Sequence, residues 1–337
     1  MRDWLHALPK AELHVHLDGS LRPETIKKLA RKLPAELRFP RGFDPCKEVI
    51  PPARGSLEEY LKTFDITVRL LQDAKALERV AYELCEDAAS ENVVYIEVRF
   101  APLLHIDLGL KPRDVVTSVL AGLQRAEEEF GILPGLILTA LKQESTERSM
   151  EVAQLAAQFA GKGVVAFDLA GPEKHYPARL HRAPIEFVHA ASVHMTLHAG
   201  EACCPEQIRE SLDLGAERIG HGVHAYEDPA IEKRLIDEAI PLEVCPTSNL
   251  QTSATITSYA EHPIKRYFDL GIPVTLNTDN RLMSQITLTD EYERISEAFS
   301  LSKEEILQIA RNGIEASFCD DSVKQSLRDR LEEFSAK

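Results

Sequence analysis

Two histidines and an aspartate recur at every second position in the stretch AELHVHLDGS, residues 11–20. In a β-strand, successive side chains point to opposite faces, so His14, His16 and Asp18 would share one face and the apolar residues between them the other. A bound divalent cation readily explains two buried imidazoles side by side, and zinc is the common metal for histidine ligands. An isolated His-x-His can equally combine one structural and one surface histidine, so the stretch alone leaves both interpretations open.

Polar groups also follow three later apolar runs, in the segments HAGE (198–201), GHGVH (220–224) and NTDN (277–280). His198 adds a third imidazole and Asp279 a carboxylate. With the first pair they could form one metal shell with a position left for water, made of His14, His16, His198 and Asp279. An open position of this kind distinguishes a catalytic zinc site from a structural one.

Two further side chains are candidates for proton transfer beside this shell. Glu201 follows His198 by three residues, after Gly200, where the backbone can turn sharply. A carboxyl group there could act as a general acid if burial raises its pKa, and the alternative is a glutamate stabilised at a helix N-terminus. His221 lies between two glycines, so its imidazole could approach a nucleophile. His224 has no such setting and is interpreted as structural.

Eight short runs rich in Val, Ile and Leu are spaced along the chain, most of them separated by segments with helical patterning. The runs are ELHVHL, VVYIEVRF, GLILTAL, VVAFDLA, MTLHA, RIGHGV, PLEVC and PVTLN. Alternating strands and helices predict a parallel sheet, and eight units favour a (β/α)8 TIM-type barrel of the α/β class. Such barrels carry their active sites at the carboxyl ends of the strands, where these polar groups fall. An open doubly wound sheet is the alternative, but no Gly-x-Gly-x-x-Gly follows the first run.

The segment between the first two runs, about residues 20–90, is longer than the other connections. Ser56 and Glu59 form a capping-box signature within it, and the surrounding residues have helical patterning. We predict an all-helical insertion after the first strand, which could cover the barrel mouth as a lid or pack on the barrel flank. We expect residues 1–337 to form a single metal-dependent hydrolase barrel domain.

The composition limits the partners that this chain can have. Lys and Arg number 39 against 54 Asp and Glu, the formal net charge is -15, and no basic block is present, which disfavours binding to nucleic acid. The six cysteines include no Cys-x-x-Cys pair, as expected for a reducing compartment. No apolar run reaches 18 residues, and the N-terminus lacks a signal-peptide pattern. We therefore expect a cytoplasmic protein that binds neither membranes nor nucleic acids; oligomeric state is not indicated.

The sequence resembles the adenosine deaminase family from Leu13 almost to the C-terminus. The matching pieces are ELHVHLDGSLRPET, VVYIEVRFAP, VVAFDLAGPE, HAGE, ERIGHGVHAYED, CPTSN and LNTDN. The resemblance implies a barrel with one zinc ion per chain, held by His14, His16, His198 and Asp279. It also implies a small-molecule purine nucleoside as partner, and the hydrolytic deamination of adenosine and 2'-deoxyadenosine to inosine and 2'-deoxyinosine plus ammonia, in purine salvage.

The same resemblance implies roles for the site residues. Attack at purine C6 breaks aromaticity and places negative charge on N1, so the reaction needs a nucleophile and a proton donor at N1. By motif position, Glu201 would protonate N1, while His221 and Asp279 would orient and deprotonate the attacking water. The implied substrate contacts are His16, Asp18 with the ribose, the backbone amide of Gly171 with N3, and Asn280 with N7.

Two departures from the family pattern concern the substrate. Asn280 and Arg281 stand where members of the family often carry Asp and Pro. Pro172 stands where other members carry a different residue. The departures leave adenine and aminofutalosine as alternative substrates. Asp18 favours a nucleoside, because adenine-specific relatives tend to carry Glu at that position.

Other functional classes are less compatible with the residues. A two-metal amidohydrolase would need a bridging ligand such as a modified lysine, and the fourth run, VVAFDLAG, contains no lysine. A catalytically silent binding barrel would be expected to lack a metal ligand, Glu201 or His221, and all are present. The second class of zinc deaminases requires a Pro-Cys-x-x-Cys motif, which is absent from this sequence.

Overall fold

The computed structural model describes residues 1–253 and 255–336. The described residues form eight parallel strands, each paired with the next along the chain. The strands are β1 Lys10–His16, β2 Val93–Phe100, β3 Leu133–Leu141, β4 Val164–Ala170, β5 His194–Ala199, β6 Arg218–His221, β7 Leu242–Val244 and β8 Val274–Leu276. All eight predicted runs are therefore strands, and they follow one another in sequence order.

The ring of strands closes between β1 and the segment that follows β8. The amide of His16 donates to the carbonyl of Asp279 at 2.7 Å, and the amide of Asp279 donates to the carbonyl of His14 at 3.0 Å. An open doubly wound sheet would leave its two outer strands apart, so the prediction of a TIM-type barrel is confirmed. Closure also brings the backbones of three predicted metal ligands together.

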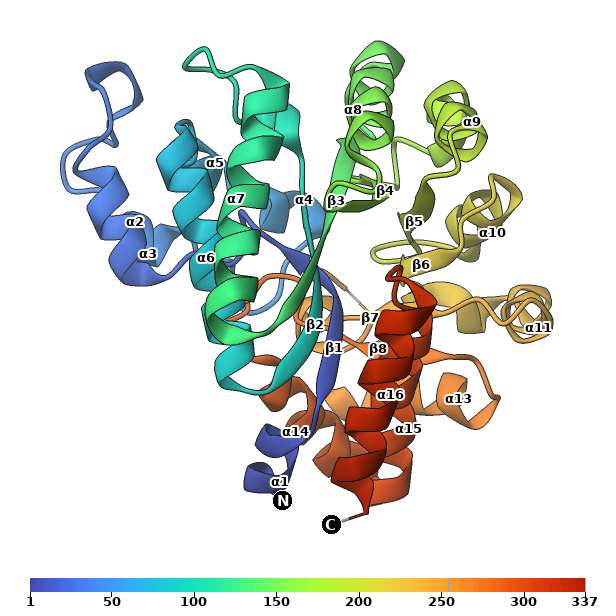
Figure 1. Cartoon of the computed structure of the whole chain (residues 1–337). Helices are drawn as coiled ribbons and strands as arrows, with labels where there is room; N and C mark the ends of the chain where they lie inside the picture. The colour runs from blue at the N-terminus through green and yellow to red at the C-terminus, as the bar shows by residue number, and fades with distance from the viewer. Residues whose placement is uncertain (254, 337) are drawn as a thin grey trace.

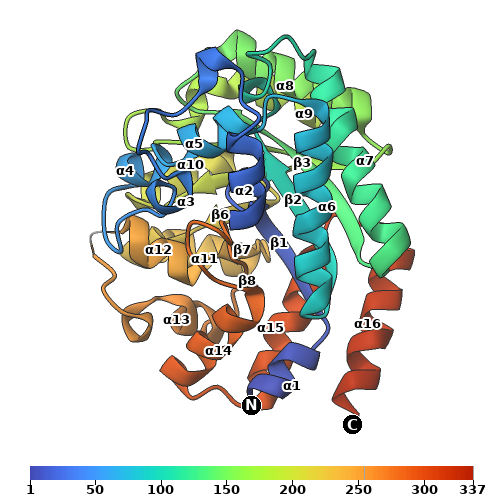
Figure 2. The same ribbon diagram turned by 90° about the vertical axis from the view of Figure 1, so that its left-hand side faces the viewer.

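Helices surround the strands, and the two termini lie at the same end of the molecule (Figures 1 and 2). Outside the β1–β2 connection they are α1 Arg2–Ala7, α7 Pro112–Phe130, α8 Thr146–Phe159, α9 Arg182–Ala190, α10 Pro205–Asp213, α11 Pro229–Asp237, α12 Pro246–Thr252, α13 Ile264–Asp269, α14 Leu288–Phe299, α15 Lys303–Ala316 and α16 Asp321–Ser335. Apolar side chains of β1 such as Leu13 and Val15 are fully buried. All eight residues of β2 are buried, so both faces of this strand are covered, as is normal for parallel strands.

The long connection between β1 and β2 is largely helical. It contains α2 Pro23–Ala30, α3 Pro45–Glu48, α4 Leu57–Leu61, α5 Phe64–Leu70 and α6 Ala74–Ser90. Ser56 and Glu59 form the predicted capping box at the start of α4. The amide of Gly55 donates to the carbonyl of Gln251 in α12, and the Phe64 ring lies 6.0 Å from that of His16. This part of the connection therefore lies at the carboxyl end of the barrel.

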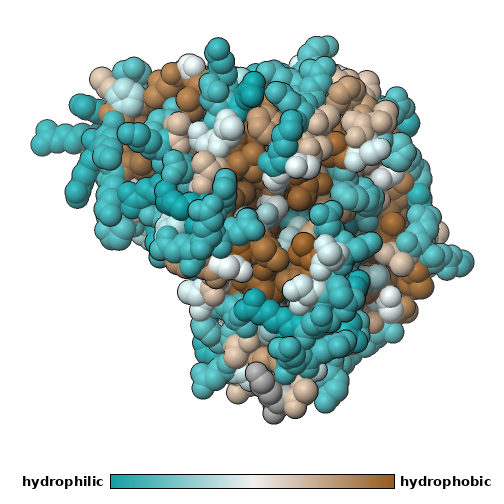
Figure 3. Space-filling view, in the orientation of Figure 1, coloured by the Kyte–Doolittle hydropathy of each residue, from teal (hydrophilic) through white to brown (hydrophobic). Residues whose placement is uncertain are grey.

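The face of the molecule drawn in Figure 3 is mostly hydrophilic, with hydrophobic residues in smaller groups between the polar ones. Within residues 1–253 and 255–336, no helix combines the length and apolar character needed to cross a membrane. The assignment of residues 1–337 to one domain stays a prediction.

Candidate active site

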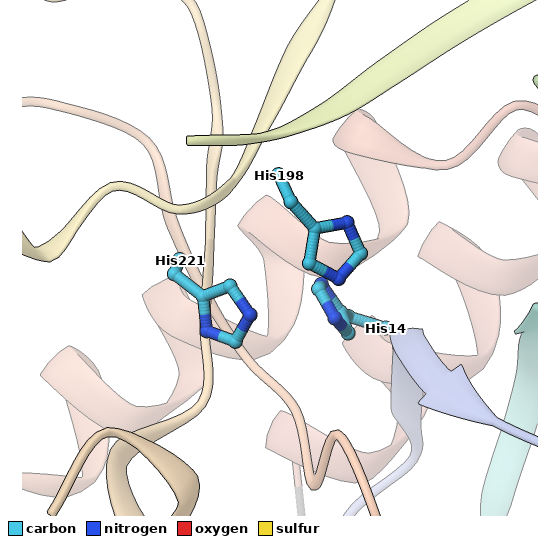
Figure 4. A group of neighbouring side chains, drawn as sticks. All are labelled: His14, His198 and His221. Atoms are coloured by element: carbon cyan, nitrogen blue, oxygen red, sulfur yellow. The ribbon is translucent and has the colours of Figure 1, made fainter. Parts of the chain in front are cut away.

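Six of the predicted site side chains converge at the carboxyl end of the strands, which we call the mouth. Potential ligand atoms lie within 4.8 Å of one another in three overlapping sets: His14, His198 and His221; His14, His16 and Asp279; and Glu201, His221 and Asp279. Figure 4 shows the imidazoles of the first set, which come from three different strands and face one another. The carboxyl ends of parallel strands meet at one rim of a barrel, which explains why residues so distant in sequence assemble here.

The atoms at the centre of this group are hydrogen-bond acceptors. The Nδ1 atoms of His14 and His198 lie 2.9 Å from Glu243 and 3.0 Å from Asp168, so each donates a proton to a carboxylate and its Nε2 carries a lone pair. Nε2 of His14 lies 3.4 Å from Oδ1 of Asp279, which is also an acceptor. Acceptors facing one another in a buried space repel unless a cation lies between them.

Further distances support a metal-binding arrangement. Nε2 of His16 lies 3.3 Å from Oδ1 of Asp279 and 3.4 Å from Nε2 of His198. Nε2 of His14 is buried and has no hydrogen-bond partner among the described residues. Three imidazoles and a carboxylate are a donor set that suits zinc. The residues predicted as ligands therefore fit a divalent metal ion.

Asp279 is held in an ionised state by its neighbours. Burial opposes its ionisation, yet the nearby imidazoles of His14, His16 and His221 outweigh burial and hold its pKa below the usual range. Its Oδ2 accepts a hydrogen bond from the Ser248 hydroxyl at 2.5 Å, which leaves Oδ1 to face the imidazoles. Asp279 thus presents a negative charge where a cation would bind.

Beneath the mouth, the barrel interior holds a cluster of buried charged residues, which we call the interior ion cluster: Glu97, Arg99, Asp168, Arg218 and Glu243. Arg99 donates to Glu243 at 2.7 Å and to Asp168 at 3.3 Å, and Arg218 donates to Glu243 at 2.7 Å and also to Glu97. Asp168 and Glu243 are the carboxylates that bond His198 and His14. The cluster therefore fixes the orientation of two predicted metal ligands.

Glu201 lies in a turn that Glu173 organises. The carboxylate of Glu173 accepts from the backbone amides of residues 200, 201, 202 and 203 at distances of 2.8 to 3.1 Å. Gly200 has a φ of +64°, the left-handed conformation that glycine adopts without strain, as the sequence predicted. Burial, together with the charges of Asp279 and Glu173, raises the pKa of Glu201 well above its usual range. This carboxyl group can thus carry a proton into a reaction near neutral pH.

His221 and Asp279 both have backbone conformations that the sequence did not predict. Their φ angles are +66° and +60°, in the left-handed region that non-glycine residues seldom occupy. Such conformations cluster at functional sites, where the surrounding structure compensates the strain. Here they turn both side chains to the mouth, where Nε2 of His221 lies 3.7 Å from Oε2 of Glu201.

Asp18 lies beyond the end of β1, next to a histidine that the sequence did not single out. Oδ2 of Asp18 is 3.8 Å from Nε2 of His105, and both side chains are buried. Nδ1 of His105 donates to the Leu71 carbonyl at 3.0 Å, so its Nε2 is an acceptor. Neither Oδ1 of Asp18 nor Nε2 of His105 has a hydrogen-bond partner within the described parts of the chain. Together with Nε2 of His14, we call these atoms the mouth acceptors.

The other two predicted substrate contacts lie in loops at the same end. Gly171 follows β4 with a φ of +120°, and a Cβ atom there would come within 2.4 Å of the Gln143 side chain. The side chain of Asn280 packs over Gly19, where a Cβ atom would overlap it at 1.7 Å. Gly171 and Gly19 therefore allow a close approach of neighbouring side chains that a residue with a Cβ atom would block. The roles of Gly171 and Asn280 as substrate contacts stay predictions.

Several residues of this site were not identified from the sequence. Asp168 and Glu243 could have been found, because a carboxylate inside an otherwise apolar strand run needs a buried partner. Glu173 and Asn249, whose side-chain amide contacts Nδ1 of His221, lie within pieces that carry the family resemblance, but no spacing rule connects them to the other site residues. His105 follows β2 and gives no signal in the sequence alone.

The adenosine deaminase family model matches residues 9–334. An adenosine deaminase of Clostridium perfringens is 44% identical over 324 residues, which cover 95% of this chain and 97% of the relative. Among solved structures, an adenine deaminase from Arthrobacter aurescens is 28% identical with a TM-score of 0.90, covering 98% of this chain and 100% of that one. An N6-mAMP deaminase from Arabidopsis is 34% identical with a TM-score of 0.89, covering 98% and 99%.

A further solved structure bears on the metal. It is a cog1816 amidohydrolase from Burkholderia ambifaria with bound Zn, 26% identical with a TM-score of 0.91, and the match covers 99% of this chain and 93% of that one. The other three relatives are named as deaminases, and the substrates in their names are adenosine, adenine and N6-mAMP, which range from a free base to a nucleotide.

Proposed function

We propose, from the premise that this chain belongs to the adenosine deaminase family, that it deaminates adenosine and 2'-deoxyadenosine hydrolytically to inosine and 2'-deoxyinosine plus ammonia. One observation carries the proposal: a cluster of acceptor atoms suited to zinc lies beside a buried carboxyl group that keeps its proton. Attack at purine C6 with protonation at N1 requires these two functions side by side.

The proposed ligands of a single zinc ion are His14, His16, His198 and Asp279. When bound, zinc supplies Lewis-acid activation that makes water available as a nucleophile near neutral pH. The carboxylates of Glu243 and Asp168 hold two of the imidazoles with Nε2 towards the mouth, so both lone pairs point to where the ion would bind.

In this proposal Glu201 donates its proton to N1 as water attacks C6 from one face of the ring. Its burial keeps it protonated, and the turn held by Glu173 fixes its position. Asp279 and His221 orient and deprotonate the attacking water. We retain the backbone amide of Gly171 as the contact to N3, Asn280 as the contact to N7, and His16 among the substrate contacts.

The mouth acceptors favour a nucleoside as substrate. Oδ1 of Asp18 and Nε2 of His105 are buried acceptors whose partners must be donors, and sugar hydroxyl groups are donors. Free adenine would leave these two atoms unpaired, which costs binding energy. Burial raises the pKa of Asp18 to about 7, and the ionised fraction of this group near neutral pH would repel a phosphate group close to it, so a nucleotide is also disfavoured at this point.

The cellular role that we propose is purine salvage in the cytoplasm. All six cysteines are free thiols, as expected in a reducing compartment.

The test is a substrate panel. The loss of the adenosine absorbance band is followed with adenosine, 2'-deoxyadenosine, adenine, adenosine monophosphate, its N6-methyl derivative and aminofutalosine. We expect the largest kcat/KM for adenosine and 2'-deoxyadenosine. A larger kcat/KM for adenine, a nucleotide or aminofutalosine would replace the proposed substrate while keeping the reaction class. No deamination of any panel member by zinc-loaded protein would contradict the proposed reaction.

A further inference from the structure

His221 and two further buried side chains form a hydrogen-bonded chain that begins at the Nδ1 atom of the His221 ring. Nδ1 of His221 lies 3.0 Å from Nδ2 of Asn249, which belongs to α12. Oδ1 of Asn249 lies 3.2 Å from Nε2 of His262. Nδ1 of His262 lies 3.1 Å from the backbone nitrogen of Ile264, at the start of α13. All three side chains are at most 3% exposed, so water does not replace these bonds.

The direction of each bond follows from the backbone end of the chain. The amide of Ile264 can only donate, so Nδ1 of His262 must accept. Burial lowers the pKa of His262 to about 3, so the ring is neutral and its single proton lies on Nε2. Nε2 of His262 therefore donates to Asn249, and the atom of Asn249 that receives this bond is the carbonyl oxygen.

This direction determines the proton position on His221. With its oxygen towards His262, Asn249 presents its amide nitrogen to His221, and an amide nitrogen can only donate. Nδ1 of His221 therefore accepts and carries no proton. The opposite orientation of the Asn249 side chain would place two donors against each other at His262, in a buried space where unpaired donors are costly.

We propose that Asn249 and His262 are positioning residues that hold His221 in the tautomer with its proton on Nε2, so that His221 acts at the mouth as a hydrogen-bond donor. Nε2 is the ring atom that faces the mouth, 3.7 Å from Oε2 of Glu201. A neutral imidazole with a proton on that atom cannot accept another there. The inference rests on the proposed function and refines it: His221 orients the attacking water and does not deprotonate it.

The proton balance of the proposed reaction then involves two carboxyl groups. The proton that water loses on attacking C6 passes to Asp279, and Glu201 gives its proton to N1. As the C6–N6 bond breaks, the proton on Asp279 leaves with the amine as ammonia. The C6 hydroxyl returns a proton to Glu201 as the carbonyl of the product forms. His221 keeps its Nε2 proton throughout.

The test reads the tautomer directly. Protein labelled with 15N in histidine is examined by NMR without substrate, and His221 is assigned by comparison with His221→Gln. We expect the His221 proton on Nε2. In Asn249→Asp, the carboxylate can only accept, so we expect a proton on Nδ1 of His221. We also expect kcat to fall by at least about 100-fold with little change in KM, because a wrong tautomer in a histidine that acts at the reacting atoms costs this much or more.

Two variants of His262 form the matched control. The side-chain amide of His262→Gln can still donate to Asn249, so we expect the His221 tautomer and kcat to stay near those of the parent protein. His262→Phe removes the donor, and we expect a mixture of tautomers and an intermediate kcat. Zinc content and thermal unfolding are measured for each variant, so that loss of metal or of folding is recognised.

Three results would overturn the inference. They are a proton on Nδ1 of His221 in the parent protein, an unchanged tautomer in folded Asn249→Asp, and equal kcat values for the two His262 variants. Failure of the proposed function looks different, because the parent protein would then deaminate no adenosine whatever the tautomer. The NMR measurement is independent of turnover and separates the two failures.

Discussion

Two buried polar regions adjoin inside this barrel and differ in how their atoms are paired. In the interior ion cluster, among the described residues, the side-chain nitrogen and oxygen atoms have hydrogen-bond partners except Nε of Arg99. The mouth acceptors, on Nε2 of His14, Oδ1 of Asp18 and Nε2 of His105, have none there. Burial is similar in both regions, so exposure to water does not explain the difference.

The comparison separates polar groups that stabilise the fold from those available to a ligand. A buried polar atom without a partner lowers stability, so its retention needs another reason. At the mouth, the proposed function supplies that reason: a cation would pair with His14, and sugar hydroxyl groups would donate to Asp18 and His105. The two regions are connected, because Glu243 and Asp168 belong to the interior ion cluster and orient His14 and His198.

The largest effect on stability is expected in the interior ion cluster. Arg218→Met should lower the free energy of unfolding by about 3–5 kcal/mol, because Glu97 and Glu243 lose a buried cationic partner. Urea unfolding measures the loss. Asp18→Ala at the mouth is the matched control, and we expect it to change stability little. Equal losses in the two variants would remove the distinction between the regions.

Glu201→Gln should have the largest effect on turnover at the mouth. We expect kcat to fall by at least about 100-fold with zinc retained, because the variant cannot donate a proton to N1. Since the raised pKa of Glu201 keeps its proton near neutral pH, activity of the parent protein should fall as pH rises through that pKa. Metal analysis and a pH–rate profile check both points, and near-normal turnover in the variant would rule out Glu201 as the acid.

Asp168→Asn changes the point where the two regions meet. The amide accepts less strongly from His198 than the carboxylate does, so zinc affinity should fall by about 10- to 100-fold. Competition with a chelator of known affinity measures the change. Unaltered zinc affinity would show that the interior ion cluster does not support the metal ligands.

The smallest effect concerns the sugar. Asp18→Ala should lower kcat/KM for adenosine by about 5- to 30-fold, the equivalent of 1–2 kcal/mol for a lost hydrogen bond. The same variant should leave the weaker reaction with adenine unchanged, because adenine has no sugar hydroxyl groups. A parallel loss with both substrates would place Asp18 outside the sugar site.

The sequence was sufficient for the strands, and it named the four side chains of the predicted metal shell, which the structure brings to the mouth and whose role as ligands stays a prediction. Apolar runs at regular spacing indicate a barrel, and polar residues where the runs end indicate the mouth. The sequence could not show the positive φ angles of His221 and Asp279, since these depend on how the closed barrel constrains its loops. It also could not connect Asn249 and His262 to His221, because their bonds join the end of β6 to two distant points of the connection between β7 and β8.

The most direct test of this account is removal and replacement of the metal. Protein is stripped with a chelator and dialysed, and adenosine absorbance is followed as zinc is added back. We predict no deamination by the stripped protein and full recovery at about one zinc per chain, with a rise in thermal stability as the mouth acceptor of His14 gains its partner. Full activity in the stripped protein, or recovery only at two metals per chain, would contradict a mononuclear zinc site built from His14, His16, His198 and Asp279.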